Sequence, residues 1–596
     1  MTPPGRFDLS GFSQRWNLPA AAGYARRLAG HDGAVCVLAL LLVLGLSFWA
    51  WEPLLAPGLI KTHDGQQALW IYEVDRCFDD GQIPCRWLPD MAFGFGQPLF
   101  NYLSPLAYYV GELVHLTGFS IVDSLRIAFI LGFLLSGALM FLFAKGLWGN
   151  WGGALAAVFY VYAPYHALDV YVRGALSEHF AIAFFPGVLW GIQKVLSEGK
   201  LHQVLLLALF SSFLVLSHTL MAMVLFPAAV SWAGIVIWQT KRIDRVYLLL
   251  GAELWALALA AFFVVPVLFE RDLVHIDEVA TGYFNFHDHF ASWDQLFLSR
   301  SWGFGLSVPG TGDGMSFQIG WLHWGAAAAS LLTAPLLLRA RRPALATLAL
   351  FLLLFSASVF MTHEGSKFVW EAIPDLKWVQ FPWRYLSLTM LMSSLLAGGL
   401  LSSCRGRPWL SLALFAVLAA AVIGLNAEFF RVGGKLDISD AENFSGERFR
   451  QQTSVWGTFY LPIDVAVLPQ RHADPLAEAT DGRVMVSQLE QGSASLTFET
   501  EVSDGSDARM RAAVFDFPDW TVRVDGEVVR HAPEELTGAI TFTVPSGTHR
   551  VALDLEDTAV RKAGNFLSLS AWALFFLVAA VGAARKGRRA IIARSA

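Results

Sequence analysis

The chain has 596 residues, of which 55% are hydrophobic and 15% are charged, and its mean hydropathy is +0.49. These values are far from those of a soluble domain and predict a polytopic α-helical membrane protein. The formal net charge of -6 is spread over segments on both aqueous sides, and no basic tract carries interleaved aromatic residues, so nothing indicates nucleic-acid binding.

Membrane spans are predicted from apolar runs, because a stretch of roughly 20 apolar residues can cross the hydrocarbon core as a helix. We expect about twelve spans of this kind. Their approximate limits are 34–56, 122–146, 151–169, 177–197, 201–217, 219–240, 247–269, 318–338, 343–361, 385–403, 408–427 and 564–584. The first is not interpreted as a cleavable signal peptide, since it begins only at residue 34 and has spanning length.

Basic residues predict the orientation of these spans. Segment 1–33 carries Arg6, Arg15, Arg26 and Arg27. If this segment is cytoplasmic, all the later basic clusters also fall on the cytoplasmic side: Lys194 with Lys200, "TKRIDR", "RARRP", "CRGRP" and the tail "RKGRR". Both termini are then cytoplasmic. We expect a transmembrane domain over 34–427 with outer loops 57–121, 270–317 and 362–384, an extracytoplasmic β-rich domain over 428–563, and a last span with a basic tail over 564–596.

The first outer loop, 57–121, is too polar to span and too rich in aromatic residues for a free linker. Its residues 66–80 have the spacing of an amphipathic helix, whose apolar side we expect to lie on the membrane interface: Leu69, Trp70, Tyr72, Val74 and Phe78. Tyr102, Tyr108 and Tyr109 suit the same headgroup zone. Cys77 and Cys85 share this loop and are expected to form a disulfide, whereas Cys36 and Cys404 lie in or at the end of apolar runs and read as buried hydrophobic residues.

His63 and Asp64 follow the first span directly, at its expected outer mouth. A carboxylate there can take a proton from a hydroxyl that attacks an activated sugar carbon, and a nearby cation such as Arg86 can bind a phosphate leaving group. A second interpretation is a helix cap, since Asp followed by Gly and a helix is a common arrangement. Spacing alone leaves both interpretations open.

Other outward polar residues also allow two interpretations. Arg173 and Glu178 in "DVYVRGALSEHF" form either an ion pair at a helix mouth or part of a substrate site. His218 lies in a turn between two apolar runs, where a polar residue is ordinary unless it faces Asp64. Arg384 in "QFPWRYL" opens a span, where a guanidinium binds a lipid phosphate or snorkels to the interface.

Two further segments carry possible functional motifs. The stretch from His287 to His289 has a His-x-His spacing that suggests a metal, but it lacks the helical spacing of a zinc protease site, so we interpret it as an outer lid or solvated loop. In 428–563, stretches such as "ASLTFET", "ARMRAAVFDF" and "ITFTVPSGTHRVALDL" alternate apolar and polar residues and predict a small antiparallel β-sandwich. Trp520 in this domain is interpreted as a core residue rather than a carbohydrate ligand.

A resemblance adds to this interpretation. The loop "THDGQQALWIYEVDRCFDD", together with "DVYVRGALSEHFA" and "WVQFPWRYLSL", resembles the bacterial family of 6-pyruvoyl-tetrahydropterin synthase-related membrane proteins. More broadly, the layout is similar to the GT-C superfamily of integral-membrane glycosyltransferases, in which an acidic residue of the first outer loop is the catalytic centre. The resemblance implies a bacterial inner-membrane enzyme that transfers a sugar from a polyprenyl-phosphate donor to a glycan, lipid or protein, with Asp64 as general base and Arg384 at the phosphate.

The sequence departs from some branches of that superfamily, because it has His63-Asp64 where they have paired acids. A divalent ion such as Mg²⁺ or Mn²⁺ is therefore left open, and it would need further oxygen ligands such as Asp169 or Glu178.

Two other functions remain as alternatives. A transporter or flippase of lipid-linked saccharide predicts ionisable residues within the spans and internal repeats, and the sequence shows few of the former and no obvious repeat. A non-catalytic assembly protein for a surface polymer would tolerate replacement of Asp64.

Overall fold

The computed structural model describes residues 33–310, 312–338, 342–404, 407–454, 459–503 and 505–595. Almost all of the predicted N-terminal segment 1–33, with its four arginines, lies outside the described residues, as do parts of the basic clusters "RARRP" and "CRGRP".

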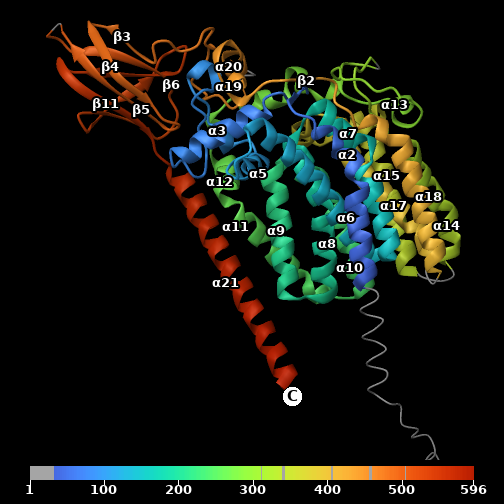
Figure 1. Ribbon diagram of the computed structural model, residues 1–596. Helices are drawn as coiled ribbons and strands as arrows, with labels where there is room; N and C mark the ends of the chain where they lie inside the picture. The colour runs from blue at the N-terminus through green and yellow to red at the C-terminus, as the bar shows by residue number, and fades with distance from the viewer. Residues whose placement is uncertain are drawn as a thin grey trace, which may run out of the picture.

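A bundle of long apolar helices forms the larger part of the molecule (Figure 1). The helices of this bundle, after the first span Gly33–Leu54, are α6 (Ile121–Val161), α8 (Leu176–Glu198), α9 (Leu201–Ser217), α10 (Thr219–Thr240), α11 (Val246–Leu259), α12 (Ala261–Phe269), α14 (Trp321–Leu338), α15 (Arg342–Thr362), α17 (Leu386–Leu400), α18 (Pro408–Asn426) and α21 (Ala559–Ser595).

The predicted count of about twelve spans is not confirmed. In the described part of the chain, 7 helices are long and apolar enough to cross a membrane, or up to 8 if one bent pair is a single span. The predicted span 122–146 and the first part of the predicted span 151–169 fall on one element, α6, which breaks at Gly149 with φ 81 and ends at Val161. The predicted span 247–269 is bent by 81° between α11 and α12, and α17 has only 15 residues. The predicted fold class, a helical membrane protein with a C-terminal antiparallel β domain, is confirmed.

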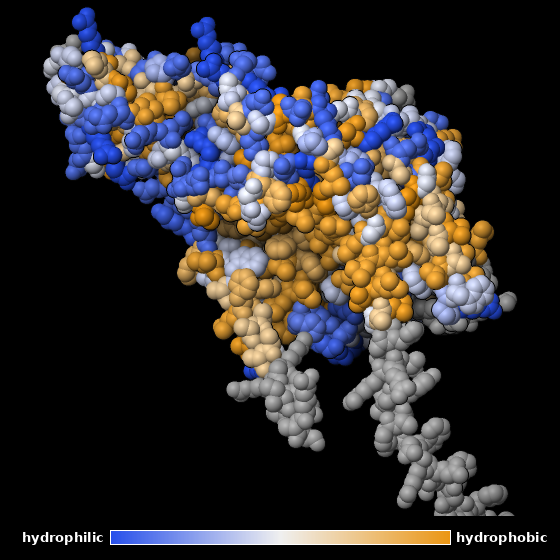
Figure 2. All heavy atoms as spheres, in the orientation of Figure 1, coloured by the Kyte–Doolittle hydropathy of each residue, from blue (hydrophilic) through white to orange (hydrophobic). Residues whose placement is uncertain are grey.

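Short elements cover one end of the bundle, which we call the loop end because α3 (Gln67–Asp79) and α5 (Leu106–His115) of the first loop lie there. In Figure 1 the β domain lies at the same end, while the turns from α8 to α9 and from α10 to α11 lie at the opposite end. Figure 2 shows an apolar band around the helices and polar residues over the loop end and the β domain. This distribution fits a bilayer around the helices.

The helix α3 does not lie on the membrane interface as expected. Leu69 and Val74 are 0% exposed and Trp70 is 6% exposed, because α5 and α6 cover this side of the helix. Tyr72 stacks on Phe444 instead of facing lipid. The apolar side of the amphipathic helix α3 is therefore buried against other parts of the protein. A disulfide joins Cys77 at the end of α3 to Cys85.

The other short helices of the loop end connect the larger elements. They are α2 (Phe48–Trp51), α4 (Met91–Gly94), α7 (Pro164–Ala167), η3 (Leu168–Arg173), α13 (Trp293–Phe297), α16 (Lys367–Ala372), α19 (Asp440–Asn443) and α20 (Gly446–Thr453), with further 3₁₀ turns between them. The first residue of α19 also caps the N-terminus of α6: the Asp440 carboxylate accepts hydrogen bonds from the backbone N–H groups of Ile121 and Val122.

Two antiparallel sheets form the C-terminal β domain. One has the order β3-β6-β10-β9 and the other β4-β5-β11-β7-β8. The strands are β3 (Ala477–Asp481), β4 (Val484–Gln491), β5 (Ser495–Val502), β6 (Ala508–Phe515), β7 (Trp520–Val524), β8 (Glu527–Val529), β9 (His531–Pro533), β10 (Ala539–Val544) and β11 (Gly547–Leu555). A separate pair, β1 (Leu59–Ile60) and β2 (Lys435–Leu436), joins the first loop to the segment after α18.

The β domain and the first loop share one hydrophobic core. Trp87 meets Trp520 edge to face at 5.5 Å, and Phe95 stacks on Phe515 at 5.2 Å. Trp520 is 3% exposed and is therefore a core residue. A Cβ at Gly96 would lie 2.3 Å from Trp87 Nε1, so the backbone can approach the indole only at a glycine.

We expect Trp87→Ala to separate the β domain from the first loop. Truncating a buried tryptophan costs about 3–5 kcal/mol, and this one completes a core made from two distant segments. Limited proteolysis of the full chain in detergent should cut the segment before β3 faster than in the wild type. Leu116→Ala, at a loop residue that is 62% exposed, is the control and should leave the rate unchanged. Equal cleavage of the Trp87 variant and the wild type would contradict the shared core.

Candidate functional site

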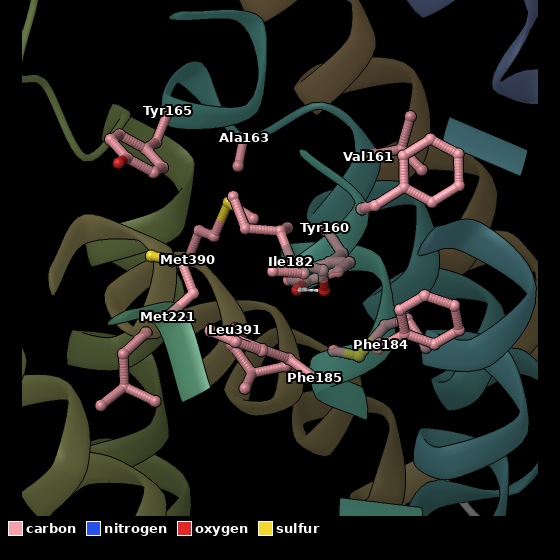
Figure 3. Packing of buried hydrophobic residues seen from close by; sticks show 14 of the residues in the cluster. Tyr160, Val161, Ala163, Tyr165, Ile182, Phe184, Phe185, Met221, Met390 and Leu391 are labelled. Carbon is pink, nitrogen blue, oxygen red and sulfur yellow. Dashed lines mark hydrogen bonds between the residues drawn. The ribbon is translucent and has the colours of Figure 1, made fainter. Parts of the chain in front are cut away.

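A cavity of about 940 Å³ opens at the loop end. Its walls come from the first loop, the turn after η3, the loop-end termini of α8, α10 and α12, and the outer loops 270–317 and 362–384. Five of the residues predicted for the site in addition to Asp64 line it: His63, Arg173, Glu178, His218 and Arg384. In the packed interior of the bundle, the Tyr160 hydroxyl donates a hydrogen bond to the Ile182 carbonyl oxygen at 2.7 Å (Figure 3).

Backbone hydrogen bonds fix Asp64 beside Arg173. The Asp64 N–H donates to the Arg173 carbonyl oxygen at 2.8 Å, and the His63 N–H donates to the Val172 carbonyl oxygen at 3.0 Å. Gly174 makes this approach possible: its φ is 70, and a Cβ there would lie 2.2 Å from the Thr62 hydroxyl oxygen. On the other side, His63 Nε2 lies 3.1 Å from the Phe304 carbonyl oxygen. The pair His63-Asp64 is thus held between two loops and does not cap α3 through its side chains.

The Asp64 carboxylate is half-buried and lines the cavity. Within the described ranges it forms no ion pair and accepts no hydrogen bond from another side chain or N–H group. Burial raises the pKa of Asp64, and the Glu178 charge acts in the same direction. The charges of Arg173, His63 and Arg384 oppose that rise in pKa. This carboxylate is therefore available to a ligand and is more basic than an exposed one.

Two buried guanidinium groups share one carboxylate near Asp64. Glu178 Oε2 accepts from Arg173 Nη1 at 2.7 Å and from Arg384 Nε at 3.2 Å. Arg173 Nη1 also donates to Asp169 Oδ1 at 2.6 Å. Arg173 and Arg384 are each 6% exposed and Glu178 is 1% exposed. The predicted ion pair of Arg173 and Glu178 is therefore present, and it lies in the cavity wall rather than on a surface.

Aromatic rings and one amide orient these arginines. The Arg173 guanidinium lies 4.6 Å from the centre of the Trp383 ring, and Arg384 lies 5.1 Å from the Phe381 ring. Arg384 Nη1 donates to Gln380 Oε1 at 2.6 Å. In both arginines Nη2 bonds to no atom of the described residues, so each keeps N–H donors for a ligand.

Arg86, which was predicted to bind phosphate, lies outside the cavity lining. It forms an ion pair with Asp557 and donates to the side chains of Asn101 and Asn565. These partners join the first loop to the start of α21, so Arg86 is a structural residue there. The sequence could not show this, because Asp557 and Asn565 are far along the chain.

Other residues of the site were not predicted. The Tyr165 hydroxyl donates to Glu178 Oε1 at 2.6 Å, and Gln380 binds Arg384 as described above. Both are uncharged, and an uncharged polar residue in an apolar stretch gives no charge pattern to detect. Gln67, Tyr108 and Ser177 also line the cavity.

The donor set does not fit a resident metal ion. In the part of the chain that the structure describes, no three His, Cys, Asp or Glu side chains are grouped so as to hold one, and this covers His287 and His289. Both oxygens of Glu178 already accept hydrogen bonds, two of them from guanidinium groups. His289 bonds to Ser307 and to a backbone carbonyl instead. Asp64 alone is too small a ligand set for a divalent cation that the protein itself would hold.

The cavity has a polar rim and an apolar side. At the rim, Lys377 pairs with Asp277 at 3.7 Å, which connects the two outer loops across the opening. From α10 and α12 the lining includes the apolar residues Leu220, Met223, Val267 and Leu268, of which Met223 is 37% exposed and Leu268 60% exposed. The cavity lining is therefore partly polar and partly apolar.

The chain matches a family model described as "6-pyruvoyl-tetrahydropterin synthase related domain; membrane protein" over residues 100–432. An uncharacterized protein from Lactococcus lactis subsp. cremoris (strain MG1363) is 23% identical over 198 residues, which are 32% of this chain and 32% of that protein. The chain thus covers 32% of the length of that curated relative.

Solved structures with a similar arrangement include arabinofuranosyltransferase AftD from Mycobacteria, with TM-score 0.41 and 16% identity over 68% of this chain and 28% of that chain. Oligosaccharyltransferase AglB from Archaeoglobus fulgidus, in complex with an inhibitory peptide and a dolichol-phosphate, has TM-score 0.39 and 12% identity over 72% of this chain and 60% of that chain. ArnT from Cupriavidus metallidurans, bound to undecaprenyl phosphate, has TM-score 0.34 and 16% identity over 66% of this chain and 67% of that chain.

We expect the purified chain to bind no Mn²⁺ at Asp64. Electron paramagnetic resonance of Mn²⁺ titrated into the detergent-solubilised protein should show the same free-ion signal with the wild type and with Asp64→Asn. The physical reason is that Glu178 is occupied by two guanidinium groups. A bound fraction that Asp64→Asn abolishes would show that the ligand set is larger than described.

Proposed function

The chain belongs to the family of 6-pyruvoyl-tetrahydropterin synthase related membrane proteins, and we propose that it is a membrane glycosyltransferase. Its loop-end cavity holds the Asp64 carboxylate beside the guanidinium groups of Arg173 and Arg384. The donor is a polyprenyl-phosphate-linked sugar. The loop end faces the outside of a bacterial inner membrane, with both termini in the cytoplasm. The acceptor is a hydroxyl-bearing glycan, lipid or protein.

The observation that supports this proposal is the Asp64 carboxylate, which accepts no hydrogen bond from the described residues, beside the guanidinium groups of Arg173 and Arg384. Asp64 takes the proton of the acceptor hydroxyl as its oxygen bonds to the anomeric carbon. The bond from that carbon to the phosphate oxygen breaks, and the electron pair leaves with the polyprenyl phosphate. The free N–H groups of the arginines bind this phosphate as its charge increases.

The apolar side of the cavity suits the lipid part of such a donor. Leu220 and Met223 of α10 face Val267 and Leu268 of α12 across this side of the lining. A polyprenyl chain entering there stays in the apolar band while its phosphate reaches the arginines.

The alternative of a saccharide transporter is less well supported. Tyr160, Ile182, Phe185 and Leu391 are buried side chains of one hydrophobic cluster in the helical bundle (Figure 3). A transport route for a saccharide needs polar groups across the membrane. A non-catalytic assembly role is separated from catalysis by the first experiment below.

We expect Asp64→Asn to lower transfer of labelled sugar from polyprenyl-phosphate donors to membrane acceptors by about 10²–10⁴-fold, because the amide cannot accept the proton. Membranes containing each variant are supplied with the labelled donors, and labelled acceptor is counted. Asp75→Asn is the matched control, since Asp75 is an acid of the same loop that does not line the cavity. Equal transfer by the wild type and Asp64→Asn would reject the proposed base and favour an assembly role.

We also expect a specific dependence on pH. Asp64 must be ionised to act as a base, and burial raises its pKa above the ordinary value of about 3.9, so kcat/KM should fall as the pH drops through a point above that value. Arg384 lowers the pKa of Asp64, so Arg384→Gln should move this acid limb to higher pH in the activity that remains. A limb at the ordinary value, or one that moves to lower pH in the variant, would contradict the assignment.

A further inference from the structure

A buried, uncharged polar group lies beside Asp64 and is not used by the proposed reaction. It consists of Gln67 at the start of α3, Tyr108 of α5 and Ser177 of α8, and we call it the neutral trio. All three residues line the cavity, and they are 4%, 1% and 7% exposed. Three helices thus bring three hydrogen-bonding side chains to one wall.

The neutral trio is a connected network with capacity left over. Tyr108 donates its hydroxyl proton to Gln67 Oε1 at 3.1 Å and accepts from the Ser177 hydroxyl at 3.1 Å. Gln67 Nε2 has no partner among the described residues, and it is not among the buried polar atoms that protein closes off. An N–H donor and the remaining lone pairs of two hydroxyl oxygens therefore face the cavity.

The surroundings define the kind of ligand. Trp70 meets Tyr108 edge to face at 5.3 Å and lines the cavity as well, so the hydrogen-bonding groups stand next to an apolar ring. Donors and acceptors beside an aromatic surface match a sugar ring, which has hydroxyl groups at its edge and C–H groups on its face.

Asp64, the charged group whose effect on the neutral trio is resolved, disfavours charged sugars there. Burial raises the pKa of Tyr108, and the charge of the nearby Asp64 acts in the same direction; the neutral trio has no cation of its own. The carboxylate of a uronic acid bound there would meet Asp64 as a like charge. An amino sugar would pair with Asp64 and occupy the base. A sugar without charge avoids both effects.

We propose that the neutral trio binds the sugar of the lipid-linked donor and restricts it to uncharged sugars. This inference rests on the proposed glycosyl transfer. With the phosphate at Arg173 and Arg384, the sugar next to it reaches the neutral trio and presents its anomeric carbon near Asp64. A site of buried groups that hydrogen-bond a substrate discriminates strongly, because the wrong substrate leaves those groups unpaired.

The first test measures binding without catalysis. Isothermal titration compares a short prenyl phosphate with the same prenyl phosphate carrying glucose, mannose, galactose or glucuronic acid, on the full chain in detergent. We expect at least one of the three neutral sugars to tighten binding about tenfold over prenyl phosphate, and glucuronate not to tighten it. Gln67→Leu and Ser177→Ala should each remove most of that tenfold gain while leaving prenyl phosphate binding unchanged.

Ser124→Ala is the matched control for Ser177→Ala. Ser124 is 0% exposed in α6, its hydroxyl has no partner in the structure, and it does not line the cavity, so its removal should leave sugar binding unchanged. Binding that is equal for prenyl phosphate and all three neutral donors, or that is tightest for the glucuronate, would overturn the inference. So would a sugar-dependent gain that survives in both Gln67→Leu and Ser177→Ala.

The two levels of the account fail in different ways. If Asp64→Asn has no effect on transfer, the glycosyltransferase proposal fails whatever the titrations show. If transfer depends on Asp64 while neutral and uronic donors react with equal kcat/KM, the reaction stands and the assignment of the neutral trio fails.

Discussion

The buried carboxylate of Glu178, held between Arg173 and Arg384, is the interaction on which the site depends. Without it, Arg384 would lose the ion pair that it forms among the described residues and Arg173 would keep only Asp169, and breaking a buried ion pair costs about 3–5 kcal/mol. The same contact joins η3, α8 and the loop before α17. Because Asp64 bonds to the backbone of Arg173, the position of the carboxylate that we propose as the base follows from this cluster.

The β domain contributes to the same arrangement from a distance. Its core is completed by Trp87 and Phe95 of the first loop, and the segment that leads to it supplies Asp440 as a cap for α6. Tyr460, in the segment between α20 and β3, lines the cavity and stacks on Tyr102. The domain is thus a support for the first loop and a part of the cavity wall, rather than a separate module on a linker.

The sequence predicted much of this site, because charged residues next to apolar runs are conspicuous and the outer loops converge at one end of the bundle. Asp64, Arg173, Glu178, His218 and Arg384 meet in one cavity for that reason. Arg86 shows the limit, since its partners lie in a segment with no local relation to it. The neutral trio shows another limit, because glutamine, tyrosine and serine give neither a charge pattern nor a hydrophobic periodicity from which a site could be predicted. The predicted number of spans stays unconfirmed, and hydropathy alone detects neither the break at Gly149 within α6 nor the bend between α11 and α12.

The proposal places the phosphate of a lipid-linked donor at Arg173 and Arg384, with the sugar between these arginines and Asp64. A cryo-electron microscopy structure of the full chain in lipid nanodiscs, with a bound polyprenyl-phosphate sugar, measures it directly. The account predicts the phosphate within hydrogen-bonding distance of Arg173 and Arg384 and the anomeric carbon facing the Asp64 carboxylate. A donor whose phosphate lies at the polar rim beside Lys377, with Asp64 turned away from the sugar, would contradict it.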